Sequence, residues 1–319
     1  MKSNITKSDY IIARINRFGD IHSVRKIVRN WHDVLLYRSG LKKRVILRLR
    51  HSGKTFEINS EKDYLAFWNS PIMVDELLAE WRNEKGVKIG KGVITVDMNG
   101  RVARFLYRDS TELMKSLGTI RETFIDGIYS DLDVSNRQVL DIGGNIADSA
   151  IYFSLSGAKK VYALEPYSVL YNMGKRNITR SGVSNRVLFL KAACGGRSGT
   201  VDLGSNAVPG SGVSGSGKGG EKLRMFTLEE LVRKYKLLDA CLKIDCEGCE
   251  YSILMDSNIE TLQHFKQISM EYHYGYLNIK DRLRRAGFAV THTRPKYSFH
   301  SEQENPVLYY GTLFAESTR

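Results

Sequence analysis

The sequence is poor in cysteine and proline, with four cysteines and five prolines among 319 residues. Three of the cysteines fall within nine residues, so we expect no disulfide framework spanning the fold and infer a reducing compartment. The chain also lacks an apolar run near the ~20 residues that a membrane helix needs. Its N-terminus lacks the apolar stretch of a signal peptide. These absences predict a cytoplasmic protein with no membrane span.

Positive charge is concentrated at the front of the chain. Residues 1–54 contain 14 Lys and Arg against 3 Asp and Glu, whereas the remaining residues contain 34 against 32. A basic segment attracts phosphates, nucleic acid, anionic lipid heads or an acidic partner, but charge alone does not identify the target. A solvated basic face explains the pattern equally well. Nucleic acid is therefore a partner that we consider but do not favour.

Residues 1–115 are predicted to form a small basic α+β unit. Apolar positions recur at helical spacing over residues 8–38 and again over 61–83. Two segments are typical of hairpins, "KRVILRLRHSGKTFEINS" and "GVITVDMNGRVARFLYR". The second contains Asn99-Gly100, the strongest short hairpin turn. We find no motif in this unit that carries chemistry.

Residues 116–319 follow a different pattern, in which short apolar strands alternate with helices, as in "RQVLDIGGN", "ADSAIYFSLSGA" and "KKVYALEP". This alternation predicts right-handed βαβ units and a mostly parallel sheet. Two final strands, "AVTHTRP" and "VLYYGTLFAES", predict an antiparallel hairpin at one edge. The Gly/Ser tract at 204–220 is predicted to be mobile. We interpret it as a surface insertion in preference to a lid.

Ligands of such sheets bind at the carboxyl ends of the strands, near the point where the strand order reverses. The first strand ends in "DIGGNIADS", and Glu165 ends the next strand, 24 positions after Asp141. A carboxylate at Glu165 can accept two hydrogen bonds from a ribose diol. NAD and S-adenosylmethionine both fit this pairing. Asp141 and Asn145 suit the charged groups of S-adenosylmethionine better than the pyrophosphate of NAD.

Five motifs extend this pattern in a fixed order: "VLDIGGNIADSAIYFSLSGAKKVYALEP", "KRNI", "VLFLKAACGG", "LKIDCEGCEYSIL" and "ISMEYH". Together they resemble the FkbM-type S-adenosylmethionine-dependent methyltransferases over roughly residues 120–315. The resemblance implies an α/β class I methyltransferase fold, Rossmann-like, with a seven-stranded, mostly parallel sheet and an antiparallel terminal hairpin. It also implies S-adenosyl-L-methionine as the cofactor.

The resemblance assigns cofactor contacts to four strand ends, the last of them at Asp245, which would face the transferred methyl group. The turn after the first strand would cradle the methionine end, the second strand end would bind the ribose, and the "KAACGG" turn would flank the adenine. The residues concerned are Asp141, Gly143, Gly144, Asn145, Glu165, Ala193, Cys194 and Asp245. Ala147 departs from the family, which usually carries glycine at this position.

The stretch "LKIDCEGCEYSIL" contains Cys246 and Cys249. A zinc site needs four ligands, and Cys241 adds only a third, at a spacing that matches no common zinc site. No other redox feature accompanies the CxxC pattern. The resembling family has small apolar residues at both positions. We therefore predict that these cysteines are small, buried packing residues.

Catalytic candidates follow the fourth and fifth strands. Asp245 ends the fourth strand, and Glu271 and His273 end the fifth, so the three are expected to face one cleft. Methyl transfer to a hydroxyl needs alignment and a base, and Asp245 and His273 are the candidates. We also weighed a metal ion held by all three residues, and we favoured a metal-free base. Glu250 begins the next helix and is expected to be structural.

We therefore predict a methyltransferase that acts on a hydroxyl of a small-molecule or glycan acceptor. The preference for oxygen rests on the resemblance alone. One alternative is an RNA methyltransferase that binds phosphates through the basic N-terminal residues 1–115, although no recognisable RNA-binding module is present. Another is a non-catalytic binding protein that keeps the fold. The acceptor, the methylated atom and the oligomeric state stay open.

Overall fold

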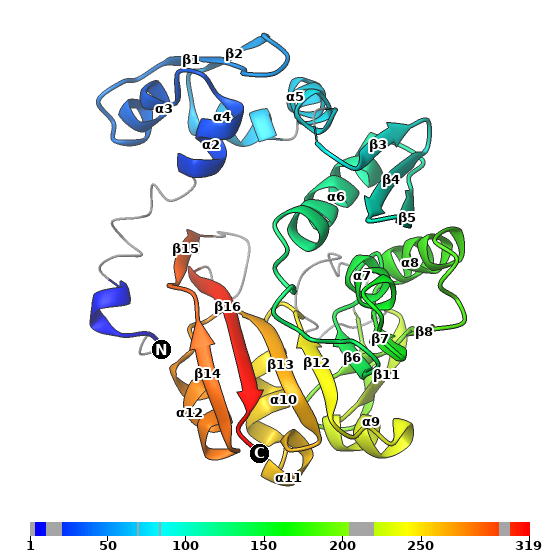
Figure 1. Ribbon diagram of the computed structural model, residues 1–319. Helices are drawn as coiled ribbons and strands as arrows, with labels where there is room; N and C mark the ends of the chain where they lie inside the picture. Colours follow the sequence, from blue (N-terminus) through cyan, green and yellow to red (C-terminus); the bar gives the residue numbers. More distant parts are fainter. Residues whose placement is uncertain (1–3, 11–20, 69, 83, 204–219, 300–306) are drawn as a thin grey trace.

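The computed structural model describes residues 4–10, 21–68, 70–82, 84–203, 220–299 and 307–319. The largest sheet in these ranges has eight strands (Figure 1). Seven of them lie side by side in the order β14 (Phe288–His292), β16 (Val307–Ser317), β13 (Phe265–Tyr272), β12 (Ala240–Ile244), β6 (Gln138–Ile142), β7 (Lys160–Leu164) and β8 (Val187–Leu190). The eighth, β15 (Lys296–Phe299), pairs with the beginning of β16.

The sheet has the predicted mixture of directions. Strands β13, β12, β6, β7 and β8 are parallel to one another. Strand β16 runs antiparallel to both of its neighbours, β13 and β14. The antiparallel terminal strand is thus confirmed, and it lies inside the sheet, with β14 at the edge.

Helices cover both faces of the sheet because its strands are apolar on both sides. Neighbouring side chains alternate between two cores: Val139 packs in one and Leu140 in the other. The first core includes residues of α6 (Ser110–Ile120), α7 (Asp148–Leu155) and α8 (Ser168–Arg180). The second includes residues of α9 (Leu228–Tyr235), α10 (Glu250–Asp256), α11 (Ile259–Leu262) and α12 (Leu277–Arg285).

The front of the chain has a third, separate core. It belongs to α2 (Ile21–Ile27), α3 (Trp31–Arg38), β1 (Val45–Arg48), β2 (Thr55–Ile58), α4 (Glu61–Trp68) and the start of α5 (Pro71–Trp81). Strands β1 and β2 form the first predicted hairpin. These elements lie together, away from the large sheet (Figure 1). We call residues 21–81 the basic unit.

A second small sheet, of β3 (Val87–Gly90), β4 (Val93–Met98) and β5 (Arg101–Leu106), contacts α7 and α8, which cover one face of the large sheet. Its β4–β5 pair is the second predicted hairpin. Two side chains, one in α8 and one directly after it, bind the backbone of β5. The N–H of Leu106 donates to Oδ1 of Asn177, and the N–H of Arg104 donates to the hydroxyl oxygen of Ser181. The apolar residues of this small sheet therefore belong to the same core as one face of the large sheet.

The predicted division between residues 115 and 116 lies within α6. In addition, the backbone carbonyl of Asn4 accepts hydrogen bonds from Tyr276 and Leu277, so the described residues 4–10 lie beside the C-terminal half of the chain. The exact domain boundary stays a prediction.

A small sheet that begins shortly after β8 was not predicted. It consists of β9 (Ala193–Cys194), β10 (Gly199–Asp202) and β11 (Lys222–Phe226), in the order β10-β11-β9. The predicted mobile tract lies outside the described residues, apart from Gly220. None of the helices in the described ranges is long and apolar enough to cross a membrane.

Candidate active site

Two strand-end loops meet between β6 and β12, where the strand order reverses. The backbone N–H of Asp245 donates to the carbonyl of Ile142, at 3.0 Å. Gly143 follows with φ of +83°, and a Cβ on it would lie 1.7 Å from the carbonyl oxygen of Asp245. Only glycine permits this approach. Ligands of open α/β sheets bind at such a crevice.

Glu165 closes the turn after β6. Its carboxylate accepts hydrogen bonds from the backbone N–H groups of Asn145 at 2.9 Å and Tyr167 at 2.8 Å. Glu165 is buried, and this burial raises the pKa of its carboxyl group to about 7. A carboxylate has about four acceptor positions, so roughly two stay available for a diol.

Asp141 lies under the turn. It is completely buried, accepts a hydrogen bond from Ser149 at 2.7 Å and lies 3.1 Å from the ammonium of Lys243. That ammonium also donates to the carbonyl of Gly143, at 2.6 Å. Although burial alone would lower the pKa of Lys243, the carboxylates of Asp141 and Asp245 raise it. Lys243 thus links Asp141 to the glycine turn.

Two non-glycine residues of this turn have left-handed backbone conformations. Asn145 has φ of +45° and Ala147 has φ of +65°. Asparagine tolerates this region, whereas alanine is strained there. The family's usual glycine at the position of Ala147 is explained by this geometry.

Ala193 and Cys194 follow the third strand and are both buried. They form β9, which pairs in parallel with Met225 and Phe226 of β11. The two side chains pack in different cores, one on each face of the sheet. A ligand beside them would meet their backbone.

Four titratable side chains gather at the ends of β12 and β13. We call Asp245, Glu247, Glu271 and His273 the strand-end cluster. Single ligand atoms of Asp245, Glu247 and His273 lie within 4.8 Å of one another. Burial, followed by the charge of Asp245, raises the pKa of Glu271 to about 8. The hydroxyl of Tyr129 donates to Asp245 at 3.2 Å.

His273 is fixed on both ring nitrogens. Nδ1 lies 2.8 Å from Oε1 of Glu250, and Nε2 lies 3.2 Å from Oε2 of Glu247. Burial alone would lower the pKa of His273, but the hydrogen bonds of Glu247 and Glu250 raise it to about 12. In this arrangement each ring nitrogen of His273 faces a carboxylate, so neither nitrogen is placed to accept a proton from an acceptor hydroxyl.

Glu250 begins α10 and is structural, as the sequence predicts, whereas Glu247 is not among the site residues predicted from the sequence. Glu250 is completely buried, and its carboxylate also accepts hydrogen bonds from the backbone N–H groups of His273 and Gly248. Its structural role is to hold His273. Glu247 instead belongs to the cluster, with a left-handed φ of +57°. The sequence offered one indication of this role: Glu247 stands two residues after Asp245 and directly before Gly248.

The prediction that Cys246 and Cys249 are small, buried packing residues is only partly correct, because both side chains pack against the second core at partly buried positions. The structure joins them in a disulfide, and neither is fully buried. The bridge closes the short loop that connects Asp245 to α10. Cys194 and Cys241 are free, buried cysteines, as packing residues would be.

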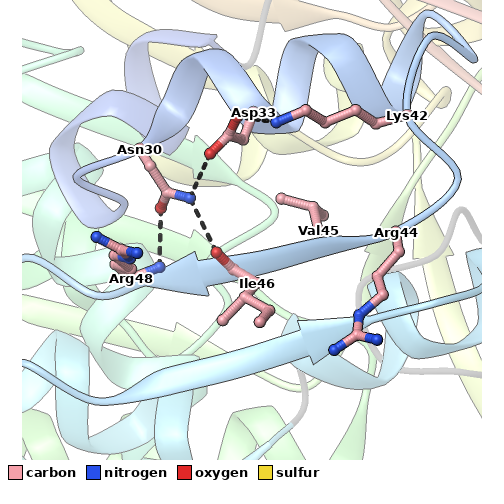
Figure 2. A pocket seen from close by; sticks show the side chains of 7 residues that line it. All are labelled: Asn30, Asp33, Lys42, Arg44, Val45, Ile46 and Arg48. Atoms are coloured by element: carbon pink, nitrogen blue, oxygen red, sulfur yellow. Dashed lines mark hydrogen bonds and ion pairs between the residues drawn. The ribbon is translucent and has the colours of Figure 1, made fainter.

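The basic unit contains a hollow of about 420 Å³ beside β1 (Figure 2). Its charged groups are largely paired: Asp33 binds Lys42, and Arg44 binds Glu57. Asn30 donates to Asp33 and to the carbonyl of Ile46 (Figure 2). The hollow therefore offers few unsatisfied groups to a ligand.

The sheet order and the strand-end site define a class I methyltransferase fold. Residues 141–290, slightly less than half of the chain, match the family model described as the methyltransferase FkbM domain. Uncharacterized protein 158B of Sulfolobus islandicus rod-shaped virus 1 is 25% identical over 157 residues, which are 49% of this chain and 73% of that protein.

Solved structures with a similar fold include two methyltransferases. TrmK of M. capricolum, in complex with S-adenosyl-homocysteine, has a TM-score of 0.39 at 14% identity, covering 61% of this chain and 67% of its own. An rRNA methylase of Streptococcus thermophilus has a TM-score of 0.35 at 10% identity, covering 65% of this chain and 96% of its own.

Proposed function

We propose that this chain transfers the methyl group of S-adenosylmethionine to a hydroxyl of a small or carbohydrate-like acceptor. The observation that carries the proposal is the meeting of the Glu165-closed glycine turn and the strand-end cluster at one crevice. The glycine turn is suited to binding a nucleoside, and the strand-end cluster is suited to proton transfer. The choice of oxygen as the methylated atom rests on the family.

The cofactor supplies a methyl group made electrophilic by a sulfonium. The carboxylate of Glu165 would bind the ribose diol, and the turn of Gly143, Gly144 and Asn145 would hold the methionine end. The backbone of Ala193 and Cys194 would flank the adenine. Asp141 would act on the turn through Lys243, because its own carboxylate is buried against that ammonium.

Transfer to a hydroxyl forms a carbon–oxygen bond, breaks the carbon–sulfur bond with its electron pair going to sulfur, and releases one proton. We assign the uptake of this proton to Asp245, which the Tyr129 hydroxyl orients. Glu271 lies beside it with a pKa raised to about 8, which suits onward proton transfer near neutral pH. His273, fixed between two carboxylates, would hold Glu247 in place.

Calorimetry with S-adenosylhomocysteine tests the cofactor assignment. We expect binding by the wild type, and a loss of roughly 1–3 kcal/mol in Glu165→Gln, the scale of hydrogen bonds to a charged group. Glu260→Gln, an exposed carboxyl of α11, is the matched control and should bind like the wild type. Absence of binding, or tight binding of NADH in its place, would refute the proposal.

A further inference from the structure

The strand-end cluster has the geometry of a metal-ligand set. Asp245 and Glu247 come from the loop after β12, and His273 comes from the end of the neighbouring β13. One ligand atom of each lies within 4.8 Å of the other two. Bonds of about 2.0–2.2 Å place two ligands of one ion up to ~4.4 Å apart. The three atoms therefore need only a small contraction to share an ion.

The orientation of His273 is an independent observation that points to the same ligand. The carboxylate of Glu250 binds Nδ1 at 2.8 Å and the backbone N–H of the same residue at 3.1 Å. Because Glu250 is completely buried, it fixes the ring with Nε2 3.2 Å from Oε2 of Glu247. An ion bound at Nε2 would replace the proton that this contact holds, since metal binding to imidazole releases a proton. Histidines that bind metals almost always donate the other ring N–H to such a partner.

The loop that carries the two carboxylates is also restrained. Glu247 has a left-handed backbone at φ of +57°, a conformation that persists only where the surroundings enforce it. The Cys246–Cys249 disulfide encloses Glu247, and a Cβ on Gly248 would lie 3.1 Å from the ring of Tyr274. These restraints hold the Glu247 carboxylate beside Asp245.

The chemistry of the triad indicates the kind of ion. Asp245 and Glu247 supply two carboxylates, and His273 supplies one imidazole. Two carboxylates with one imidazole suit divalent transition metals better than magnesium, which prefers oxygen alone.

We propose that Asp245, Glu247 and His273 bind one divalent transition-metal ion, such as Mn²⁺, with open positions toward the crevice. This proposal reverses the metal-free expectation from the sequence. It also differs from the metal alternative considered there, in which Glu271 was a ligand in place of Glu247. The ion site stands on its own geometry. Its part in acceptor binding rests on the proposed methyl transfer, where the ion would orient a hydroxyl and lower its pKa.

Mn²⁺ titration of the chelator-treated full chain, followed by electron paramagnetic resonance of free Mn²⁺, tests the site without cofactor or acceptor. We expect one ion per chain and nitrogen coupling from an imidazole in the pulsed spectrum. Glu247→Gln should weaken Mn²⁺ binding at least about tenfold. This is the smallest loss of metal affinity expected even for residues that only hydrogen-bond to a metal ligand. His273→Gln should remove the nitrogen coupling.

Glu271→Gln is the matched control, because it removes a carboxylate of the cluster that lies outside the ligand triad. Its Mn²⁺ affinity should stay within about threefold of the wild type, a difference near 0.6 kcal/mol. An equal loss in Glu271→Gln and Glu247→Gln would mean unspecific attraction and refute the site. So would failure of the wild type to bind one ion, or binding without nitrogen coupling. Calorimetry with S-adenosylhomocysteine on the same samples tests the proposed function separately, and circular dichroism checks folding.

Discussion

The basic unit and the strand-end crevice use charge in opposite ways. In the basic unit, cations on exposed segments bind nearby carboxylates, as Lys42 binds Asp33 and Lys54 binds Asp75. In the crevice, carboxylates gather in partly or fully buried positions, and burial raises the pKa of Glu165 and Glu271. Exposed charge costs little free energy, whereas buried like charge costs much.

The two regions therefore differ in how much free energy their charges cost. Perturbed pKa values gather at functional sites, which makes the crevice with Glu165 and Glu271 the better candidate for chemistry. Most of the net charge of +13 lies in residues 1–54, outside this crevice.

The largest expected difference concerns two Lys–Asp pairs. Lys243→Met would leave the buried Asp141 unpaired and should lower the free energy of unfolding by about 3–5 kcal/mol. Lys54→Met breaks a pair whose side chains are about half exposed and should cost less than about 1 kcal/mol. Urea unfolding measures both.

A double variant guards against simple misfolding of Lys243→Met. Asp141→Leu combined with Lys243→Met removes both charges, and a buried pair replaced by apolar residues is often tolerated. The double variant should therefore be more stable than Lys243→Met alone. Equal costs for Lys243→Met and Lys54→Met would show that the buried pair has no special importance.

The next difference concerns two glycines with positive φ. Gly143→Ala should lower the unfolding free energy by roughly 2–4 kcal/mol, because the new Cβ would meet the carbonyl oxygen of Asp245. Gly53→Ala, in the β1–β2 hairpin, has open space around it and should cost only ~1 kcal/mol for its φ of +70°. If thermal melts rank the two variants in the reverse order, the contact between the strand-end loops is not as tight as described.

Asp148 and Asp33 should respond to pH with opposite signs. Burial raises the pKa of Asp148 to about 7 in the folded chain, above its unfolded value, so the folded state binds the extra proton. Its contribution to stability is therefore lost as pH rises from about 4 to about 7. Hydrogen bonds of Lys42 and Asn30 lower the pKa of Asp33, whose contribution is instead lost as pH falls.

Asparagine substitutions report this contrast. Asp148→Asn should match the wild type at pH 5 and exceed its stability by roughly 1–2 kcal/mol at pH 8, where the buried carboxyl is costly. Asp33→Asn should cost less than about 1 kcal/mol at pH 8, since its pair is partly exposed. An Asp148→Asn variant with the same pH dependence as the wild type would contradict the raised pKa.

Much of the fold was predictable because its signals are local. Alternation of apolar strands with helices predicts the parallel sheet, and Asn99-Gly100 predicts the β4–β5 hairpin that forms. Strands β10 and β11 were missed because their pairing depends on residues 20 or more positions apart. The attachment of β5 to α8 through Asn177 is likewise a long-range contact without a local pattern.

The site was predictable as a set of strand ends and much less as a set of contacts. Topology brings Asp245 and His273 together, because parallel neighbouring strands end at one edge. The fixation of His273 by Glu250 depends on how α10 packs against β13, which no spacing specifies. The disulfide was missed for a similar reason: a family comparison suggested packing residues, whereas the loop brings Cys246 and Cys249 together.

The smallest expected effect concerns the basic unit itself. Arg29 and Arg50 of this unit donate to the backbone carbonyls of Arg50 and Arg25, which gathers several guanidinium groups beside β1. We expect weak, sequence-independent binding of single-stranded RNA, with a salt slope near −0.7 per phosphate contact. Replacing Arg48, an exposed residue of β1, by Ala should reduce affinity at low salt by less than about tenfold and flatten the slope by about one contact. Fluorescence anisotropy with a labelled oligonucleotide measures both. RNA binding that is sequence-specific and persists at physiological salt would contradict a merely solvated basic face, and it would make RNA the acceptor to test first.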